Sequence, residues 1–263
     1  MITVLNFDDT LIPQTRYYYL PFRVIECKEI RGTKLFCEER SLLLLTRLLQ
    51  NREKDRVVLI GCADYHYVSY ILLAEMVQPF TLVLFDNHAD LRQSPERTLL
   101  SCGSWVARAA ELQYLVKIVI IGARPDSFLG ADCRALQKVL YAPYSPGNLE
   151  TAALPESIAP IEEQGIASVI REVIEKIPTD DVYISIDKDV LCKEDALTNW
   201  DQGEMTLQEL LVALRSLASS KQICGVDLCG EEVLHPLDWM RAKGQEVIRK
   251  NAVANMQICS LFC

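Results

Sequence analysis

The chain has 263 residues, of which 50% are hydrophobic, and it carries a formal net charge of -9. A chain of this length and apolar content can bury a sizeable core. No stretch rich in Gly, Ser or Pro divides it, so we expect a single domain over residues 1–263. The acidic balance leaves no basic stripe to neutralise phosphate groups, which argues against nucleic acid and anionic membrane surfaces as partners.

The lack of recognisable targeting signals and the pattern of cysteines predict a cytoplasmic protein. The N-terminus has no basic segment leading into a long apolar run, so we predict no signal peptide. The apolar run at residues 41–45 is far too short to span a bilayer. The ten cysteines are scattered, and no CxxC pair occurs. We therefore predict reduced, mostly buried thiols in a cytoplasmic protein.

In chain order, short apolar runs alternate with segments of helical periodicity. We expect strands at residues 2–7, 57–60, 80–85, 116–121, 139–142, 182–186 and 222–229. We expect helices at residues 38–50, 67–76, 105–112, 161–177, 206–219 and 241–261, and an irregular segment at residues 15–29. This alternation predicts an α/β protein with three layers, α/β/α, in which helices cover both faces of a mostly parallel central sheet.

The strand at residues 80–85 runs into a DNHAD segment that begins at Asp86. Side chains at i, i+2 and i+4 of an extended backbone point the same way, so Asp86, His88 and Asp90 are expected to converge just past the strand end. Two carboxylates and an imidazole aimed at one point need a positive charge between them, most simply a divalent metal ion. Polar residues after a strand are also ordinary loop entry, so this pattern alone leaves both interpretations open.

A second strand repeats the arrangement and favours the metal site. The apolar run at residues 182–186 ends directly in Asp187 and Asp189, again two residues apart. Open α/β sheets build their sites at the carboxyl ends of strands, so two strands that each deliver acids there indicate one shared site. His66 lies at a third junction between a strand and a helix, where it could supply a further ligand or simply cap the helix.

With these residues in place, the chain resembles the family of arginases, agmatinases and formiminoglutamases, the ureohydrolases. Members of that family carry a GGDH element, a DxHxD element and an SxDxDxxDP element, in this order. The corresponding segments of this chain are GCADYH at residues 61–66, DNHAD at residues 86–90 and SIDKD at residues 185–189. The resemblance covers roughly residues 57–232, and it implies the arginase-like α/β/α fold that metal-dependent deacetylases share.

The resemblance also implies a site for two manganese ions that share ligands and activate a bridging hydroxide. One ion would bind His66, Asp86, Asp90 and Asp187, and the other would bind Asp86, His88, Asp187 and Asp189. Hard oxygen ligands with one or two imidazoles favour manganese, whereas zinc, the alternative cofactor, prefers nitrogen and sulfur. The implied reaction is hydrolysis of a non-peptide C–N bond in a guanidino, formimino or amide compound.

The candidate catalytic residues depart from the family pattern. Cys102 stands where arginases carry a proton-shuttling histidine, although a thiol is a poorer shuttle. His235, past the last strand, is the candidate substitute, and it can equally be a surface residue. Glu231 is the carboxylate nearest to the position that grips the guanidinium in the family, although strict spacing from Asp227 places Gly230 there.

Arg92 and Asn199 are the candidate substrate-binding residues. Arg92 lies two residues past Asp90, at a place where arginase uses a neutral substrate-binding residue. If it faces the pocket, it would favour a carboxylate-bearing substrate through paired hydrogen bonds. Asn199 lies in the loop that follows the second acidic strand. An exposed loop position for Arg92 is at least as compatible with the sequence.

Three functions remain open at this point. The first is the binuclear-manganese hydrolase. The second is a zinc-dependent deacetylase of the same fold, although such enzymes typically use a pair of histidines as acid and base and this chain has only three histidines. The third is a non-catalytic metal-binding relative, which Cys102 keeps open. The expected partner of an enzyme is a small-molecule substrate, and the resemblance also implies a homo-oligomer, commonly a trimer or hexamer.

Overall fold

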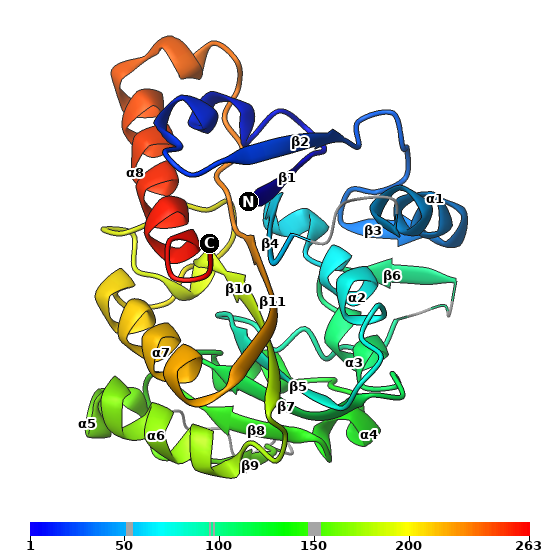
Figure 1. Cartoon of the computed structure of the whole chain (residues 1–263), viewed down its shortest axis with the longest axis vertical. Helices are drawn as coiled ribbons and strands as arrows, with labels where there is room; N and C mark the ends of the chain where they lie inside the picture. Colours follow the sequence, from blue (N-terminus) through cyan, green and yellow to red (C-terminus); the bar gives the residue numbers. More distant parts are fainter. Residues whose placement is uncertain (51–54, 95, 97, 147–153) are drawn as a thin grey trace.

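The computed structural model describes the whole chain except residues 51–54, 95, 97 and 147–153. Within the described part, nine strands form one sheet in which all strand pairs are parallel (Figure 1). Their order across the sheet is β2-β1-β4-β11-β10-β5-β7-β8-β9. The strands are β1 (Ile2–Asn6), β2 (Phe22–Glu26), β4 (Val57–Gly61), β5 (Phe80–Phe85), β7 (Leu115–Ile121), β8 (Val139–Ala142), β9 (Glu156–Ser157), β10 (Asp181–Asp187) and β11 (Gln222–Cys229). A separate antiparallel pair consists of β3 (Phe36–Glu38) and β6 (Leu99–Ser101).

Side chains that alternate along the strands build a hydrophobic core on each face of the sheet. In β5, Val83 and Phe85 belong to one core, and Leu82 and Leu84 belong to the other. All residues of this strand are buried. A strand covered on both faces has no solvent-exposed side, which explains why β5 reads as a continuous apolar run and not as an alternating pattern.

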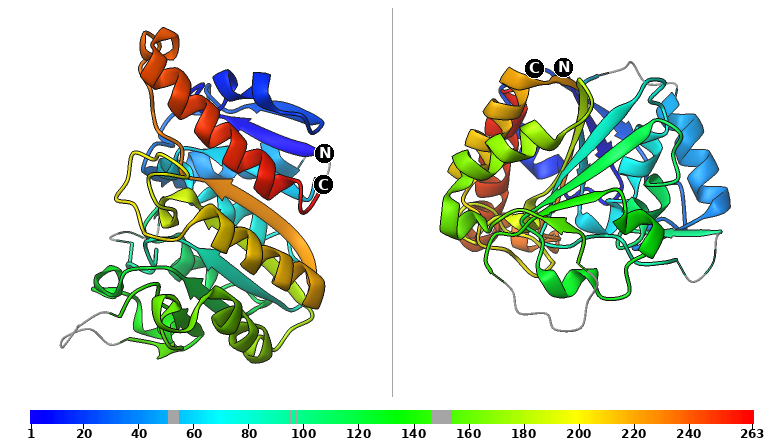
Figure 2. Two further views of the ribbon diagram at one scale, coloured as in Figure 1. Left: turned by 90° about the vertical axis from the view of Figure 1, so that its left-hand side faces the viewer. Right: turned by 90° about the horizontal axis from the view of Figure 1, so that it is seen from below.

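Helices cover both faces of the sheet (Figure 2). One face carries α5 (Ile161–Gln164), α6 (Ile166–Lys176), α7 (Leu207–Ser220) and α8 (Ala242–Cys259). The other carries α1 (Glu39–Gln50), α2 (Val68–Leu73), α3 (Trp105–Ala109) and α4 (Cys133–Leu136). Short 3-10 helices lie at η1 (Ile12–Tyr17), η2 (Ala63–Tyr65), η3 (Pro125–Phe128), η4 (Lys188–Val190) and η5 (Asp238–Met240). No helix of the described residues combines the length and the apolar character needed to cross a bilayer.

The three-layer α/β prediction is confirmed, although the structure also contains short elements that were not predicted, namely β3, β6, β9 and α4. The segment at residues 15–29, expected to be irregular, contains β2, which pairs with β1 at the edge of the sheet. Its side chains are half-buried or exposed, so it lacks the apolar run of a central strand. The helix expected at residues 161–177 is divided into α5 and α6 at Gly165, whose φ of +75° lies in a region that glycine enters readily.

The central strands deliver the predicted site residues to one edge of the sheet. β4, β11, β10 and β5 are neighbours, and their parallel pairing places all four carboxyl ends together. β10 pairs with β5 so that Ile186 lies opposite Phe85. Asp187 is the last residue of β10 and Asp86 directly follows β5, so the two acids begin from neighbouring positions.

Candidate metal centre and active site

A turn after β5 brings Asp86, His88 and Asp90 together. The strand ends at Phe85, and the backbone N–H of His88 donates to Asp86 Oδ1 at 2.7 Å. Asp90 has a φ of +52°, which is uncommon for a residue other than glycine. The three side chains converge as predicted, but a turn with a positive φ at Asp90 brings them together, and not a continuous extended backbone.

Trp105 of α3 supports this turn from a buried position. Its Nε1 donates to Asp90 Oδ2 at 2.7 Å, and the backbone N–H of Val106 donates to the Asp90 carbonyl at 3.2 Å. The Trp105 ring also packs against the His66 ring, with 4.8 Å between the ring centroids. One buried indole therefore positions two of the predicted metal ligands.

His66 directs one ring nitrogen at three carboxylates. Its Nδ1 lies 3.4 Å from Asp86 Oδ2 and 3.5 Å from Asp187 Oδ2. The same nitrogen lies 3.3 Å from Asp90 Oδ2. Asp86 and Asp187 therefore face the same nitrogen of His66.

The other nitrogen of His66 is fixed by a buried hydrogen-bond chain. Its Nε2 lies 3.0 Å from Ser185 Oγ, and that hydroxyl donates to Asp227 Oδ1 at 2.7 Å. Ser69 also donates to Asp227 Oδ1, at 2.9 Å. Because Ser185 donates its one proton to Asp227, it accepts the proton of Nε2. The lone pair of the neutral imidazole is then on Nδ1, where a metal ligand needs it.

The turn η4 presents Asp187 and Asp189 to the same centre. Asp187 Oδ1 accepts from the backbone N–H of Asp189 at 3.0 Å. Asp189 Oδ1 accepts from the backbone N–H of Asn87 at 3.0 Å, and its Oδ2 lies 2.8 Å from His88 Nδ1. The two acidic strand ends are therefore joined directly by hydrogen bonds.

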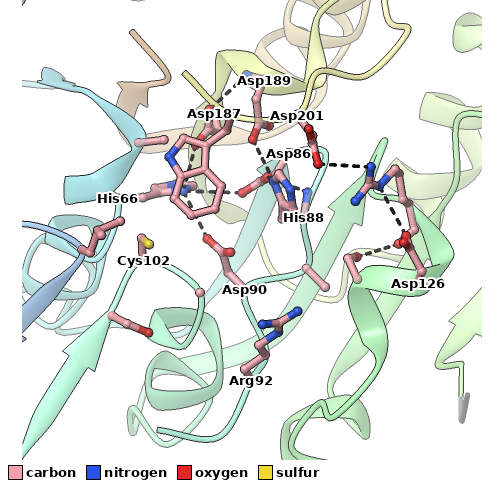
Figure 3. A pocket seen from close by; sticks show the side chains of 18 of the residues that line it. His66, Asp86, His88, Asp90, Arg92, Cys102, Asp126, Asp187, Asp189 and Asp201 are labelled. Atoms are coloured by element: carbon pink, nitrogen blue, oxygen red, sulfur yellow. Dashed lines mark hydrogen bonds and ion pairs between the residues drawn. The ribbon is translucent and has the colours of Figure 1, made fainter. Parts of the chain in front are cut away.

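Three overlapping groups of ligand atoms could hold a cation, and the atoms of each group lie within 4.8 Å of one another. Figure 3 shows the carboxylates and histidines of these groups. Asp86 belongs to two of the groups, and its Oδ2 is buried with no hydrogen-bond partner among the described residues. A buried carboxylate oxygen without a partner is costly, and a divalent cation would satisfy it. The groups are His66 with Asp86 and Asp90, Asp86 with His88 and Asp189, and His66 with Asp187 and Cys229.

The crowding of acids changes the titration of the centre. Burial raises the pKa of Asp86 well above its ordinary value, and the charges of Asp189 and Asp90 add to this effect. Burial also raises the pKa of Asp187, to about 7. Burial opposes protonation of His66, but its hydrogen bond to Asp90 and the charge of Asp187 outweigh burial and raise its pKa to about 10. The centre carries a surplus of negative charge that a bound cation would offset.

A cavity of about 630 Å³ opens onto the centre. Such a volume suits a small molecule. Besides the six predicted metal ligands, two other predicted residues line it, Arg92 at the exposed rim and Cys102 deeper in the wall. Burial raises the pKa of the Cys102 thiol above its ordinary value, so the thiol is held protonated.

Arg124 and Trp200 also line the cavity, and neither was singled out from the sequence. Arg124 Nε lies 3.3 Å from Asp126 Oδ1, and its Nη1 lies 3.7 Å from Asp201 Oδ2. The Trp200 ring stands edge-on to His88, with 5.8 Å between the ring centroids. The one available signal was their position, because both follow the carboxyl end of a predicted strand.

Glu231 does not line the cavity, so the structure does not bring this carboxylate to the place where a substrate contact was predicted. Its carboxylate forms an ion pair with Lys188, whose side chain is fully buried. It also accepts hydrogen bonds from three amide side chains, those of Gln14, Asn251 and Asn255. A buried lysine needs this partner, and the carboxylate is therefore committed to it.

Gly230 occupies the position beside the centre. Its φ is +86°, and a Cβ added there would collide with Asp187 Oδ1. Any side chain at this position would displace the carboxylate that faces His66. The fold therefore requires glycine here, and no carboxylate can extend from this position toward a substrate.

His235 and Asn199 also lie outside the cavity wall. His235 is exposed, and its Nδ1 accepts from the backbone N–H of Leu237 at 3.3 Å. Asn199 is exposed, and its Oδ1 accepts from the thiol of Cys62 at 3.2 Å. The structure thus does not bring either side chain into the cavity wall, although Trp200, the neighbour of Asn199, lines it.

Comparison with known proteins gives one family. A model of the arginase family matches residues 54–249. An uncharacterized protein of Thermotoga maritima is 29% identical over 192 residues, which span 73% of this chain and 64% of that protein. The chain therefore matches less than two thirds of the length of this relative.

Solved structures share the fold. The formimidoylglutamase of Bacillus subtilis superposes with a TM-score of 0.63 and 16% identity, covering 99% of this chain and 85% of that one. The formiminoglutamase of Trypanosoma cruzi, solved with Mn²⁺, superposes with a TM-score of 0.63 and 12% identity, covering 99% and 91%. At these identities the likeness concerns the fold alone.

Proposed function

The chain belongs to the arginase family, and we propose that it is a metal-dependent hydrolase of a C–N bond in a guanidino, formimino or amide small molecule. The observation that carries the proposal is the position of Asp86. Its carboxylate belongs to two ligand groups, and its Oδ2 is buried with no hydrogen-bond partner in the described part of the chain. A carboxylate in this position is suited to bridge two cations.

We take manganese as the cation because carboxylates and imidazoles suit it, and because the Trypanosoma cruzi structure contains Mn²⁺. Such a pair, when bound, would polarise the substrate and lower the pKa of a shared water molecule toward neutrality. The chain itself contributes the rigid placement of the carboxylates by backbone N–H groups. The first ion would be held by His66, Asp86, Asp90 and Asp187, and the second by Asp86, His88, Asp187 and Asp189.

The cavity wall favours a substrate that carries a carboxylate. Arg92 and Arg124 both line it, and the Arg92 guanidinium has no ion-pair partner among the described residues. Arginine binds a carboxylate through two parallel hydrogen bonds. At the position where family members grip a guanidinium, Gly230 supplies no charge. We therefore favour a formimino or amide nitrogen on an acidic small molecule over a free guanidinium compound.

Replacing Arg92 with alanine is expected to raise KM for a carboxylate-bearing substrate by about 10-fold to 100-fold, because a charge-assisted hydrogen bond contributes roughly 1.5–3 kcal/mol. The kcat should change little, since this contact lies away from the reacting bond. Steady-state kinetics with the substrate and with its analogue lacking the carboxylate measure the effect. Arg134→Ala removes an exposed arginine outside the cavity and is the control. An equal loss on both compounds would contradict the contact.

Cys102→His is expected to raise kcat by about 10-fold or more. Burial holds the Cys102 thiol protonated by raising its pKa, whereas an imidazole with a pKa of about 6.5 exchanges protons readily near neutrality. The measurement is kcat as a function of pH at full metal content. Cys133→His changes an exposed thiol outside the cavity and is the matched control. An unchanged or lowered kcat would argue against a shuttle role for residue 102.

A deacetylase has less support from the cavity. His66 and His88 both belong to ligand groups, and His235 is exposed outside the cavity wall. None of the three histidines is left to act in an acid–base pair.

The proposed function is tested by metal analysis together with a substrate panel. Two divalent ions per chain, at least one of them manganese, and release of urea or ammonia from guanidino, formimino or amide compounds would support the proposal. One zinc ion with release of acetate would support the deacetylase. Bound metal with no turnover on any compound would identify a non-catalytic relative.

A further inference from the structure

Cys229 ends β11 directly beside the centre. The register of the sheet pairs it with Asp187 on β10. Its thiol lies 3.2 Å from Asp187 Oδ2, and its side chain is buried. A thiol at the carboxyl end of a central strand therefore reaches one of the carboxylates through which metal binding is proposed.

The Cys229 sulfur belongs to a ligand group with His66 and Asp187, whose atoms all lie within 4.8 Å of one another. Among the described residues no other cysteine belongs to such a group. Cys102 lines the cavity without joining one. The group combines a sulfur, a nitrogen and an oxygen, which is a softer donor set than carboxylates and imidazoles alone.

Two further features indicate that this side of the centre is shaped to receive a cation. Asp86 Oδ2 is buried, lacks a hydrogen-bond partner in the described part of the chain, and lies 3.4 Å from His66 Nδ1. Gly230, the next residue after Cys229, leaves Asp187 the room that a Cβ would occupy. Asp86 Oδ2 is an observation separate from the cysteine, and like Asp187 Oδ2 it faces His66 Nδ1.

We propose that Cys229 is a sulfur ligand of the cation held by His66 and Asp187, and that this half of the centre selects a thiophilic divalent ion such as zinc. The half formed by Asp86, His88 and Asp189 has no sulfur and retains an oxygen and nitrogen donor set. On binding, the S–H bond breaks, its electron pair forms the metal–sulfur bond, and the proton passes to solvent. The proposal rests on the metal centre of the proposed function, and it changes the identity of one ion.

X-ray absorption at the zinc edge tests this on the wild-type protein loaded with zinc. A sulfur scatterer at about 2.3 Å from zinc is the expected result. Loading with cobalt provides a second probe, because a cobalt–thiolate bond gives a charge-transfer band in the near ultraviolet. A zinc shell of oxygen and nitrogen alone would overturn the proposal, and the thiol would then be only a hydrogen-bond donor to Asp187.

Variants identify which sulfur binds. Cys229→Ser is expected to abolish the cobalt band and to weaken zinc binding relative to manganese by more than about 10-fold. Cys37→Ser changes a buried thiol outside the ligand groups, and it is expected to keep the cobalt band and the wild-type strength of zinc binding. A band that survives in Cys229→Ser and disappears in Cys102→Ser would also overturn the proposal. The wild-type absorption measurement decides the question if Cys229→Ser fails to fold.

The failure of this inference is distinguishable from the failure of the proposed function. Wild-type protein that binds no divalent cation would refute both. Protein that binds two ions and hydrolyses a C–N bond, with no sulfur scatterer, would refute the sulfur ligand alone. A sulfur-bound zinc ion in a protein that turns over no compound in the panel would support the sulfur ligand and refute the hydrolase.

Discussion

Replacing Asp187 with alanine is expected to remove most of the bound metal and to reduce hydrolysis by more than about 100-fold. Asp187 Oδ2 lies 3.5 Å from His66 Nδ1 and 3.2 Å from the Cys229 sulfur. Its Oδ1 accepts the Asp189 N–H that shapes the turn η4. The substitution therefore removes a ligand and also releases Asp189, so both cation positions are affected.

Metal content by mass spectrometry and turnover on the same preparation measure this effect. Asp126→Ala is the matched control, because that carboxylate lines the cavity but belongs to none of the ligand groups. Asp187→Asn separates charge from shape, since it retains the size of the side chain. Full metal content in both Asp187 variants would refute the bridging role.

Protein freed of divalent cations by a chelator is expected to lose stability as the pH rises from about 4 to about 10. The pKa of Asp187 is raised from 3.8 to about 7, and that of His66 from 6.5 to about 10. In both cases the folded protein holds the proton more tightly than the unfolded chain does. The stabilising contribution of Asp187 is therefore lost between about pH 4 and 7, and that of His66 between about pH 6.5 and 10.

Added cation should reverse this trend, because it binds the deprotonated ligands of the folded protein. The measurement is Tm with chelator and with metal at about pH 5, 7 and 9. The difference in Tm is expected to widen with pH, to on the order of 10 °C at the highest value. Asp187→Asn cannot ionise and should flatten the lower part of the chelated curve. A Tm that rises with pH in the presence of chelator would contradict the proposed crowding of charge.

The fold and the residues around the centre were largely predictable from local sequence. A strand buried on both faces requires a continuous apolar run, and the runs that end at Phe85 and Ile186 met that requirement. The acids that follow these runs lie at the carboxyl ends of parallel strands, which the topology places at one edge. His66 follows the same rule after β4.

The structure does not bring Glu231 into the cavity wall, where the sequence predicted a substrate contact. Glu231 and Gly230 are adjacent in sequence, and no local pattern distinguishes which of them faces the centre. The choice depends on Lys188, which is 43 residues away from its partner Glu231, and on the space beside Asp187. The spacing of residues in the sequence does not predict a buried ion pair between distant segments, because only the folded chain brings the two partners together.

The sequence by itself determined a parallel α/β sheet and two strand ends rich in acids, because strand burial and side-chain alternation are local properties. The tertiary structure alone decided which neighbours those acids have. The turn at Asp90 is held by Trp105 of α3, the strand register brings the Cys229 thiol to Asp187, and Arg124 lines the cavity from the loop after β7. Such placements depend on contacts between segments that are far apart in the chain. These contacts produce no periodic pattern in the sequence from which they could be predicted.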